Sequence, residues 1–282
     1  MKILVCGDFH GTFLPKFKKI IAKEGIDALI SLGDYPPFHY RKLWFKHCFG
    51  KNVELSEIIG KKRYKKLVKE DLRMAEVSLR KLNELSIPVF TVLGNMDYPM
   101  ADDVADVDKK IEMSMPNWER TLTVTKIIKR YHNIRRFDYK YFKFDRYIFI
   151  GMRGHSFPGR PKSRAFKKHS KILEKIFKKF RKENKQRKVI FISHIVPYNT
   201  KLDKIGKHAH KEVRGQHYGS ILMKDIVKKF QPTMAFGGHI HEGIGRVRIG
   251  RTLVINPGAA HEGKAVIVEF VNGRTKEIKL IK

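Results

Sequence analysis

The sequence is poor in cysteine and has no long hydrophobic run. Its 282 residues include two cysteines, Cys6 and Cys48, which cannot form the disulfide framework of a small secreted domain. No apolar stretch approaches the roughly 18 residues that a membrane-spanning helix needs, so no membrane association is expected. The apolar run at residues 3–6 leads directly into Gly7 and Asp8, which does not fit a signal peptide. These features predict a cytoplasmic protein.

Acidic residues are also scarce, with 28 Asp and Glu against 60 Lys and Arg, a formal net charge of +32. So basic a surface attracts phosphate-bearing partners and makes their binding sensitive to salt. A surface adapted to heat would raise Glu together with Lys, which is not the case here. Two interpretations stay open, a polyanionic partner such as a nucleic acid and a lysine-rich solvated surface. The charge says nothing about the oligomeric state.

Short apolar, β-rich runs alternate with helical patterns along the chain, which is typical of a layered α/β fold. Apolar residues at helical spacing predict amphipathic helices over 61–85 and 166–182. Near the C-terminus, Asn272-Gly273 separates two alternating runs and predicts a β-hairpin. No repeat, linker or domain boundary is evident. We therefore expect a single domain over 1–282, with insertions near 37–60 and 98–120.

Five of the apolar runs end in residues that commonly bind metal ions. Because ligands of open α/β sheets bind beyond the carboxyl ends of the strands, these distant residues are expected to converge. One such Asp or His alone would more often cap a turn or lie on the surface. The five motifs, GDFHG, GD, GNMD, SH and GGHIH, supply Asp8, His10, Asp34, Asn95, Asp97, His194, His239 and His241.

Carboxylates, imidazoles and one amide suit Mn²⁺, Fe or Zn²⁺ better than Mg²⁺, which prefers an all-oxygen shell. We expect Mn²⁺ first, with Fe, Zn²⁺ and Ni²⁺ as other candidates. All of the set except Asp97 are expected to bind metal, and seven ligands are too many for one ion. If Asp34 bridges, two ions about 3.5 to 4 Å apart can share a hydroxide and hold a phosphate oxygen. This pattern predicts hydrolysis of a phosphate ester.

The same motif series resembles the calcineurin-like metallophosphoesterases, and the tail GRTLVINPGAAHEGKAVIVEF is similar to the ending of small archaeal and bacterial predicted phosphoesterases. The resemblance implies a four-layer αββα sandwich, with two mixed β-sheets flanked by helices. It also implies two metal positions that share Asp34, and a catalytic set of Asp34, Asn95 and Asp97. One position would be held by Asp8, His10, Asp34 and His241, and the other by Asp34, Asn95, His194 and His239.

One residue departs from the family pattern, because Met96 stands where the third motif commonly has histidine. A thioether cannot donate a proton, and a diester with a good leaving group needs less protonation. We therefore expect a phosphodiesterase acting on nucleotide or nucleic-acid diesters. A phosphomonoesterase or pyrophosphohydrolase is the enzymatic alternative, and a nucleic-acid-binding protein with a vestigial metal site is the other. His155 or His217 could replace the missing acid and Arg214 could bind phosphate, although each is also interpretable as a structural or surface residue.

Two basic segments bear on the substrate. Residues 38–51 interleave five aromatic residues with lysine and arginine, which suits either a base-stacking platform or a small lid whose aromatics pack on the fold. Residues 161–188 carry 13 Lys or Arg against Glu174 and Glu183. Their basic face is either a nucleic-acid site or a solvated helix surface.

Overall fold

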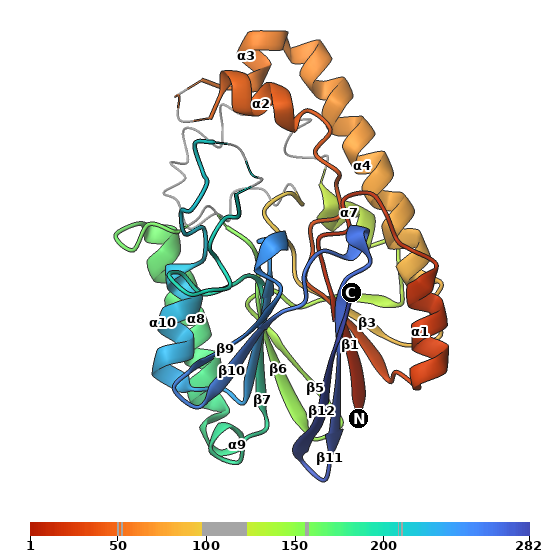
Figure 1. Ribbon diagram of the computed structural model, residues 1–282, viewed down its shortest axis with the longest axis vertical. Coiled ribbons are helices and arrows are strands. Elements are labelled where there is room, and N and C mark those ends of the chain that lie inside the picture. Colours follow the sequence, from red (N-terminus) through yellow and green to blue (C-terminus); the bar gives the residue numbers. More distant parts are fainter. Residues whose placement is uncertain (50, 52, 98–122, 156–157, 208, 210) are drawn as a thin grey trace.

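The computed structural model describes residues 1–49, 51, 53–97, 123–155, 158–207, 209 and 211–282. Two six-stranded sheets pack face to face, and helices cover the outer face of each sheet (Figure 1). The layers run helix, sheet, sheet, helix, with one apolar core between the sheets and one beneath each helical layer. The predicted four-layer α/β sandwich is therefore confirmed.

The first sheet has the order β12-β11-β1-β2-β3-β4. Neighbours from β1 to β4 are parallel, whereas β11 pairs antiparallel with both β1 and β12. Its strands are β1 (Lys2–Cys6), β2 (Ala28–Ser31), β3 (Val89–Thr91), β4 (Ile134–Arg136), β11 (Ala265–Val271) and β12 (Arg274–Ile281).

The second sheet has the order β5-β6-β7-β8-β10-β9, with a parallel centre and an antiparallel strand at each edge. Because β1–β3 and β7–β8 are parallel within their sheets, their carboxyl ends meet at one end of the sandwich. The strands are β5 (Tyr141–Phe144), β6 (Tyr147–Met152), β7 (Val189–Ile195), β8 (Met234–Gly238), β9 (Gly245–Ile249) and β10 (Thr252–Asn256).

Helices on the first sheet are α1 (Lys16–Glu24), α4 (Lys61–Asn83) and α7 (Val124–Ile128), and those on the second are α8 (Arg164–Lys179), α9 (Arg181–Lys185) and α10 (Ile221–Phe230). Two short 3₁₀ helices, η1 (His241–Gly243) and η2 (Ala260–Glu262), follow β8 and β10. No helix in the described part of the chain is long and apolar enough to cross a membrane.

The helix predicted over 61–85 is confirmed, since α4 ends at Asn83 and buries one apolar stripe against the first sheet. The helix predicted over 166–182 is corrected to two helices. The chain leaves helical geometry at Phe180, with φ −102° and ψ 31°, and the phenyl ring is buried edge-on against Tyr141 at a centroid distance of 4.5 Å. Burial of this ring therefore decides where α8 ends.

The predicted C-terminal hairpin is confirmed. Both turn residues have positive φ, 50° at Asn272 and 77° at Gly273, as a two-residue turn that matches the strand twist requires. The turn joins β11 to β12, and a bulge at Glu269 and Phe270 shifts the pairing register. The hairpin extends the first sheet to its edge.

Residues 37–60 contain α2 (Arg41–His47) and α3 (Leu55–Ile59), which lie beyond the strand ends at the top of Figure 1. Tyr40 is buried, and the rings of Phe38 and Trp44 pack against the same core. Trp44 also contacts Phe49 at a centroid distance of 5.7 Å. These contacts favour aromatics packed on the fold over an exposed stacking platform. The second expected insertion, 98–120, lies outside the described residues.

The core beneath α8 gives a stability prediction. Leu173 is fully buried there, so Leu173→Ala should lower the free energy of unfolding by about 2 to 5 kcal/mol through lost burial and a residual cavity. Lys171→Ala, on the exposed face of the same helix, should change it by less than about 0.5 kcal/mol. Urea unfolding followed by circular dichroism measures both, and equal losses would contradict the assigned face.

Candidate metal centre

The predicted ligands gather at the end of the sandwich where β1, β2, β3, β7 and β8 terminate. Four of them adopt the left-handed backbone conformation, with φ of 59° at Asp8, 44° at His10, 57° at Asp34 and 70° at His239. A non-glycine residue in this region costs about 1 to 3 kcal/mol when the conformation is strained. Such outliers concentrate at functional sites, and here they turn the side chains inward.

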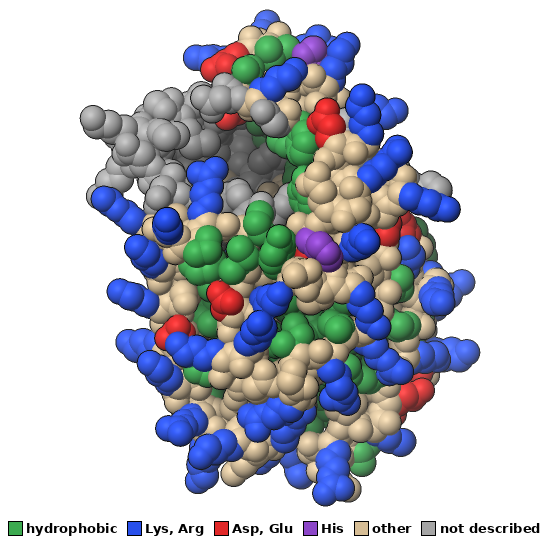
Figure 2. Space-filling view, turned by 60° about the vertical axis from the view of Figure 1, so that its left-hand side comes forward, with side chains coloured by type: hydrophobic (Ala, Val, Ile, Leu, Met, Phe, Trp, Pro, Cys, Tyr) green, Lys and Arg blue, Asp and Glu red, His purple; other side chains and the backbone are tan. Residues whose placement is uncertain are grey.

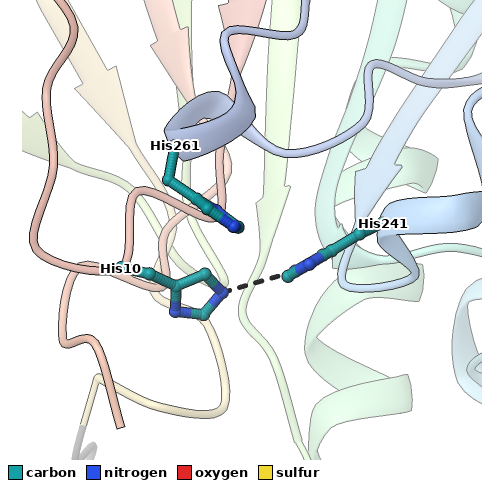
Figure 3. Close-up of side chains that lie close together, drawn as sticks. All are labelled: His10, His241 and His261. Carbon is teal, nitrogen blue, oxygen red and sulfur yellow. Dashed lines mark hydrogen bonds between the residues drawn. The ribbon is translucent and has the colours of Figure 1, made fainter. Parts of the chain in front are cut away.

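One group is formed by Asp8, His10 and His241. The Nε2 atom of His241 lies 3.3 Å from Oδ1 of Asp8 and 3.3 Å from Nε2 of His10. His10 reaches the same carboxylate oxygen at 4.0 Å. Figure 3 shows the rings of His10 and His241 converging from the loop after β1 and from η1. The carboxylate is buried, while the two imidazoles are partly exposed.

The second group surrounds His194, near the end of β7. Its Nε2 atom lies 3.3 Å from Oδ2 of Asp34 and 2.9 Å from the amide oxygen of Asn95. The ring of His239 is inclined at 64° to that of His194, at a centroid distance of 5.4 Å. Strand ends of both sheets therefore contribute to this group.

Asp34 links the two groups. Its carboxylate lies within 4.8 Å of ligand atoms of His194 and His239 on one side, and of Asp8 and His10 on the other. It is 2% exposed. Although burial favours the neutral acid, the pKa of Asp34 is lowered chiefly by His194. A charged carboxylate at this point can serve two cations at once.

The histidine tautomers test whether a metal ion fits. His10 Nδ1 lies 3.0 Å from the carbonyl oxygen of Pro36, and His194 Nδ1 lies 2.8 Å from that of Leu32. Each Nδ1 must donate to its carbonyl, so that Nε2 of the neutral ring carries its lone pair toward the ligand group. A metal ion can accept these lone pairs, and histidines that bind metal usually donate the other ring N–H to a carbonyl or carboxylate oxygen, as His10 and His194 do here.

The buried carboxylate of Asp8 gives a second indication. Its Oδ1 atom is inaccessible and has no hydrogen-bond partner among the described residues, despite the nearby His241. Its Oδ2 atom accepts the backbone N–H of His239 at 3.1 Å. An unsatisfied buried carboxylate oxygen is expensive unless a cation neutralises it. The donor set therefore fits divalent ions.

The protonation states agree with this fit. Burial, reinforced by His194, lowers the pKa of His239 to about 3, and burial also lowers the pKa of His10. Both rings are therefore neutral near pH 7, as metal ligands must be. At His194, burial opposes protonation, but the charge of Asp34 outweighs it and raises the pKa to about 9. In the absence of metal, a proton takes the place of the cation there.

Asp97 connects the loops that carry the ligands. Its Oδ2 accepts the N–H groups of Asp34 at 2.9 Å and of Gly94 at 2.7 Å, and its Oδ1 accepts that of Tyr35 at 2.8 Å. Asp97 is fully buried, and burial together with Asp34 raises its pKa to about 7. These hydrogen bonds show Asp97 capping the turns at Gly94 and Asp34.

Met96 contributes through its backbone. Its N–H donates to Oδ1 of Asp34 at 2.8 Å, a contact that does not depend on the side chain. The third motif therefore contacts Asp34 through its backbone although it lacks the usual histidine.

The proposed substrate contacts already have other partners. The Nε2 of buried His155 lies 2.7 Å from the hydroxyl of Ser220, which caps α10. His217 Nδ1 lies 2.8 Å from Asp203 Oδ1, and Arg214 donates to the carbonyl of Ala209 at 2.6 Å. The ligand group thus forms without these residues, and their role toward substrate stays a prediction.

Sequence reasoning missed His261. It lies in η2, and its ring is 5.0 Å from that of His10 and 5.2 Å from that of His241 (Figure 3). The strand-end pattern could not indicate it, because β10 ends at Asn256 and a turn intervenes. The available signal was a histidine in the tail segment that carries the family resemblance.

A glycine beside the bridging carboxylate gives a prediction for the site. A Cβ atom on Gly94 would lie 1.9 Å from Oδ1 of Asp34. Gly94→Ala should therefore displace that carboxylate and abolish tight binding of the second equivalent of Mn²⁺ in equilibrium dialysis. Gly25→Ala is the control for backbone strain. Gly25 has a positive φ, 62°, but a Cβ atom added there would have nothing within 4 Å. Unchanged Mn²⁺ binding by Gly94→Ala would contradict the described packing.

Comparison with known proteins identifies the fold. A solved structure superposes with a TM-score of 0.67 at 22% identity, covering 100% of this chain and 98% of the other. A structure from Thermus thermophilus superposes with a TM-score of 0.51 at 17% identity, covering 99% and 97%. An uncharacterized protein of Methanocaldococcus jannaschii is 26% identical over 262 residues, which is 91% of this chain and 88% of that protein.

The family assignment covers nearly the whole chain, since residues 1–280 match the metallophosphoesterase family of the calcineurin superfamily. The strand-end ligand groups described above lie within this match. The chain therefore belongs to the calcineurin superfamily of metallophosphoesterases, hydrolases that act on phosphate esters with divalent metal ions.

Proposed function

We propose that the protein is a two-metal phosphodiesterase whose substrates are nucleotide or nucleic-acid diesters. The observation that carries the proposal is the buried carboxylate of Asp34, which belongs to both ligand groups. A shared carboxylate is the feature that holds two ions close enough to act on one phosphate. Mn²⁺ is the expected metal, with Fe, Zn²⁺ and Ni²⁺ as alternatives.

In this proposal Asp8, His10 and His241 hold one ion and Asn95, His194 and His239 hold the other. When bound, the two ions would activate water as the nucleophile and neutralise charge that develops on the phosphate. The backbone carbonyls of Pro36 and Leu32 keep the ligand rings in the required tautomer. Asp97 holds the two loops at the distance that Asp34 needs.

A diester with a good leaving group is favoured because the side chain of Met96 cannot donate a proton where the family commonly has histidine. A leaving oxygen of low basicity departs without protonation, whereas an alkoxide leaving group, of a monoester or of the sugar in a nucleic-acid diester, benefits from a general acid, worth about 10²- to 10⁴-fold. Within the described residues, His155 and His217 are hydrogen-bonded to Ser220 and Asp203. A phosphomonoesterase or pyrophosphohydrolase remains the alternative enzyme.

The basic surface supports a polyanionic substrate. Figure 2 shows Lys and Arg side chains spread over the visible face, with few Asp or Glu among them. Most of the lysines and arginines in 161–188 are exposed on α8 and α9. A groove of about 720 Å³ lies along β9 and β12, and Arg246 and Arg248 are among the residues that line it. Other lining residues are Arg187, Lys201 and Lys276, against one acid, Glu277.

Hydrolysis of two generic esters tests the reaction class. Metal-stripped protein supplied singly with Mn²⁺, Ni²⁺, Zn²⁺ or Mg²⁺ should hydrolyse bis-p-nitrophenyl phosphate faster than p-nitrophenyl phosphate. Asp34→Asn should reduce this rate by more than about 10³-fold, because the shared charge is lost. Asp225→Asn, at an exposed position on α10, is the matched control and should retain full activity.

The outcomes separate the alternatives. Faster monoester turnover would favour the phosphomonoesterase, and near-normal activity of Asp34→Asn would refute the shared carboxylate. If the protein binds nucleic acid but binds no metal and hydrolyses neither ester, the alternative of a nucleic-acid-binding protein with a vestigial metal site is supported.

The salt dependence of binding tests the nucleic-acid substrate. Binding of a fluorescent single-stranded oligonucleotide should weaken linearly on a log-log plot against salt concentration, by a slope of about 0.7 per phosphate contacted. Replacement of Arg246 and Arg248 by Ala should reduce this slope by about 1.4. Lys167 and Lys171, replaced together by Ala on the exposed face of α8, make a control with the same charge loss.

A larger loss in the α8 variant would assign the contact to that helix instead of the groove. A slope near zero for the unaltered protein would contradict the proposal of a nucleic-acid substrate. The proposed substrate would then be a small diester.

A further inference from the structure

We propose that His261 is a ligand of the metal position formed by Asp8, His10 and His241, so that three imidazoles hold this ion. The inference rests on the proposed metal centre and adds to it a residue outside the strand-end motifs. Figure 3 shows the three rings facing one another across a small gap. One ring nitrogen of each lies within 4.8 Å of the other two.

The fold anchors His261 on the loop that carries Asp8. The N–H of Ala260 donates to the carbonyl of Gly7 at 2.7 Å, and the N–H of His261 donates to that of Asp8 at 3.2 Å. The imidazole adds a third contact, since its Nδ1 lies 2.9 Å from the same Asp8 carbonyl. The ring therefore has a defined position relative to the ligand carboxylate.

This contact also sets the tautomer. Because a carbonyl oxygen can only accept, Nδ1 carries the proton and Nε2 of the neutral ring presents a lone pair. His10 has the same arrangement, with Nδ1 bonded to Pro36. Within the described residues no hydrogen bond to Nε2 of His261 is found, and the carboxylate of Glu262 is 3.9 Å away. Two neighbouring imidazoles thus offer lone pairs to the same space.

The side chain is also accessible for an ion to enter, since it is 31% exposed while the Asp8 carboxylate behind it is 1% exposed. Glu262, the nearest competing charge, is paired with Lys264. The contact of His261 with Glu262, at 3.9 Å, is an ion pair only when the imidazole is protonated, and Lys264 remains as a partner of that carboxylate when the ring is neutral and binds metal.

A third imidazole makes the two metal positions chemically unequal. The first position would have three imidazoles besides the carboxylates of Asp8 and Asp34, whereas the other would have two imidazoles besides the oxygens of Asp34 and Asn95. Imidazole suits Zn²⁺, Ni²⁺ and Fe, and oxygen ligands suit Mn²⁺. His261 is thus expected to raise the affinity of the first position for Zn²⁺ more than for Mn²⁺.

The variant His261→Asn separates ligation from positioning. The asparagine amide can still donate to the Asp8 carbonyl from the place of Nδ1, but it has no counterpart of Nε2. Competition with a chromophoric chelator should show that the affinity of one position for Zn²⁺ falls by at least about tenfold. Removal of a group that only hydrogen-bonds to a metal ligand already costs about that much, so loss of a ligand should cost no less. Mn²⁺ affinity at the other position should be unchanged.

His132→Asn, at an exposed position, is the matched control and should bind both ions as the unaltered protein does. Histidine ¹⁵N NMR of the unaltered protein gives a second readout, which observes the ring nitrogen directly. The Nε2 resonance of His261 is assigned as the one that is missing in the His261→Asn spectrum. On addition of Zn²⁺ to the unaltered protein, this resonance should move to the range of metal-bound nitrogen.

If His261→Asn binds Zn²⁺ as tightly as the unaltered protein, or if the Nε2 resonance does not shift on addition of Zn²⁺, His261 is not a ligand. Either result would leave the proposal of the metal centre unaffected. Failure of the unaltered protein to bind any metal would instead overturn the proposed function itself.

Discussion

The site depends on the burial of two carboxylates, those of Asp8 and Asp34. They are 1% and 2% exposed and lie where the two sheets meet. Charge so deeply buried costs several kcal/mol unless cations and donors compensate it. His194 and the N–H of Met96 face one carboxylate, and the N–H of His239 faces the other. The strand ends are thus organised around negative charge that protein groups satisfy incompletely, which leaves a place for metal.

Precise geometry is obtained by making the backbone, rather than flexible side chains, carry the ligands. Four ligand residues have positive φ, and glycine neighbours allow close approach. At Gly238, for example, a Cβ atom would lie 2.5 Å from Oδ2 of Asp8. Asp97 then joins the loops after β2 and β3 through three backbone amides. The rigid core of two stacked sheets holds these backbone conformations in place, so their strain can persist in the folded protein.

The position of Met96 shows how the ligand frame and proton donation are separable. Its backbone N–H donates to Asp34, a contact that any side chain at this position would allow. What changes is the assistance available to a leaving oxygen. The family fold therefore accounts for phosphoester chemistry in general, while the preference for particular esters belongs to the proposed function.

The sequence by itself determined the layered α/β class, helix α4, the terminal hairpin and the convergence of the strand-end motifs. Each of these follows from local periodicity, turn chemistry or the rule that parallel strands end together. Only the tertiary structure decided that α8 stops at Phe180, that Asp97 binds backbone amides, and that His261 joins His10 and His241. These outcomes depend on contacts between residues far apart in the chain, about which local pattern carries no information.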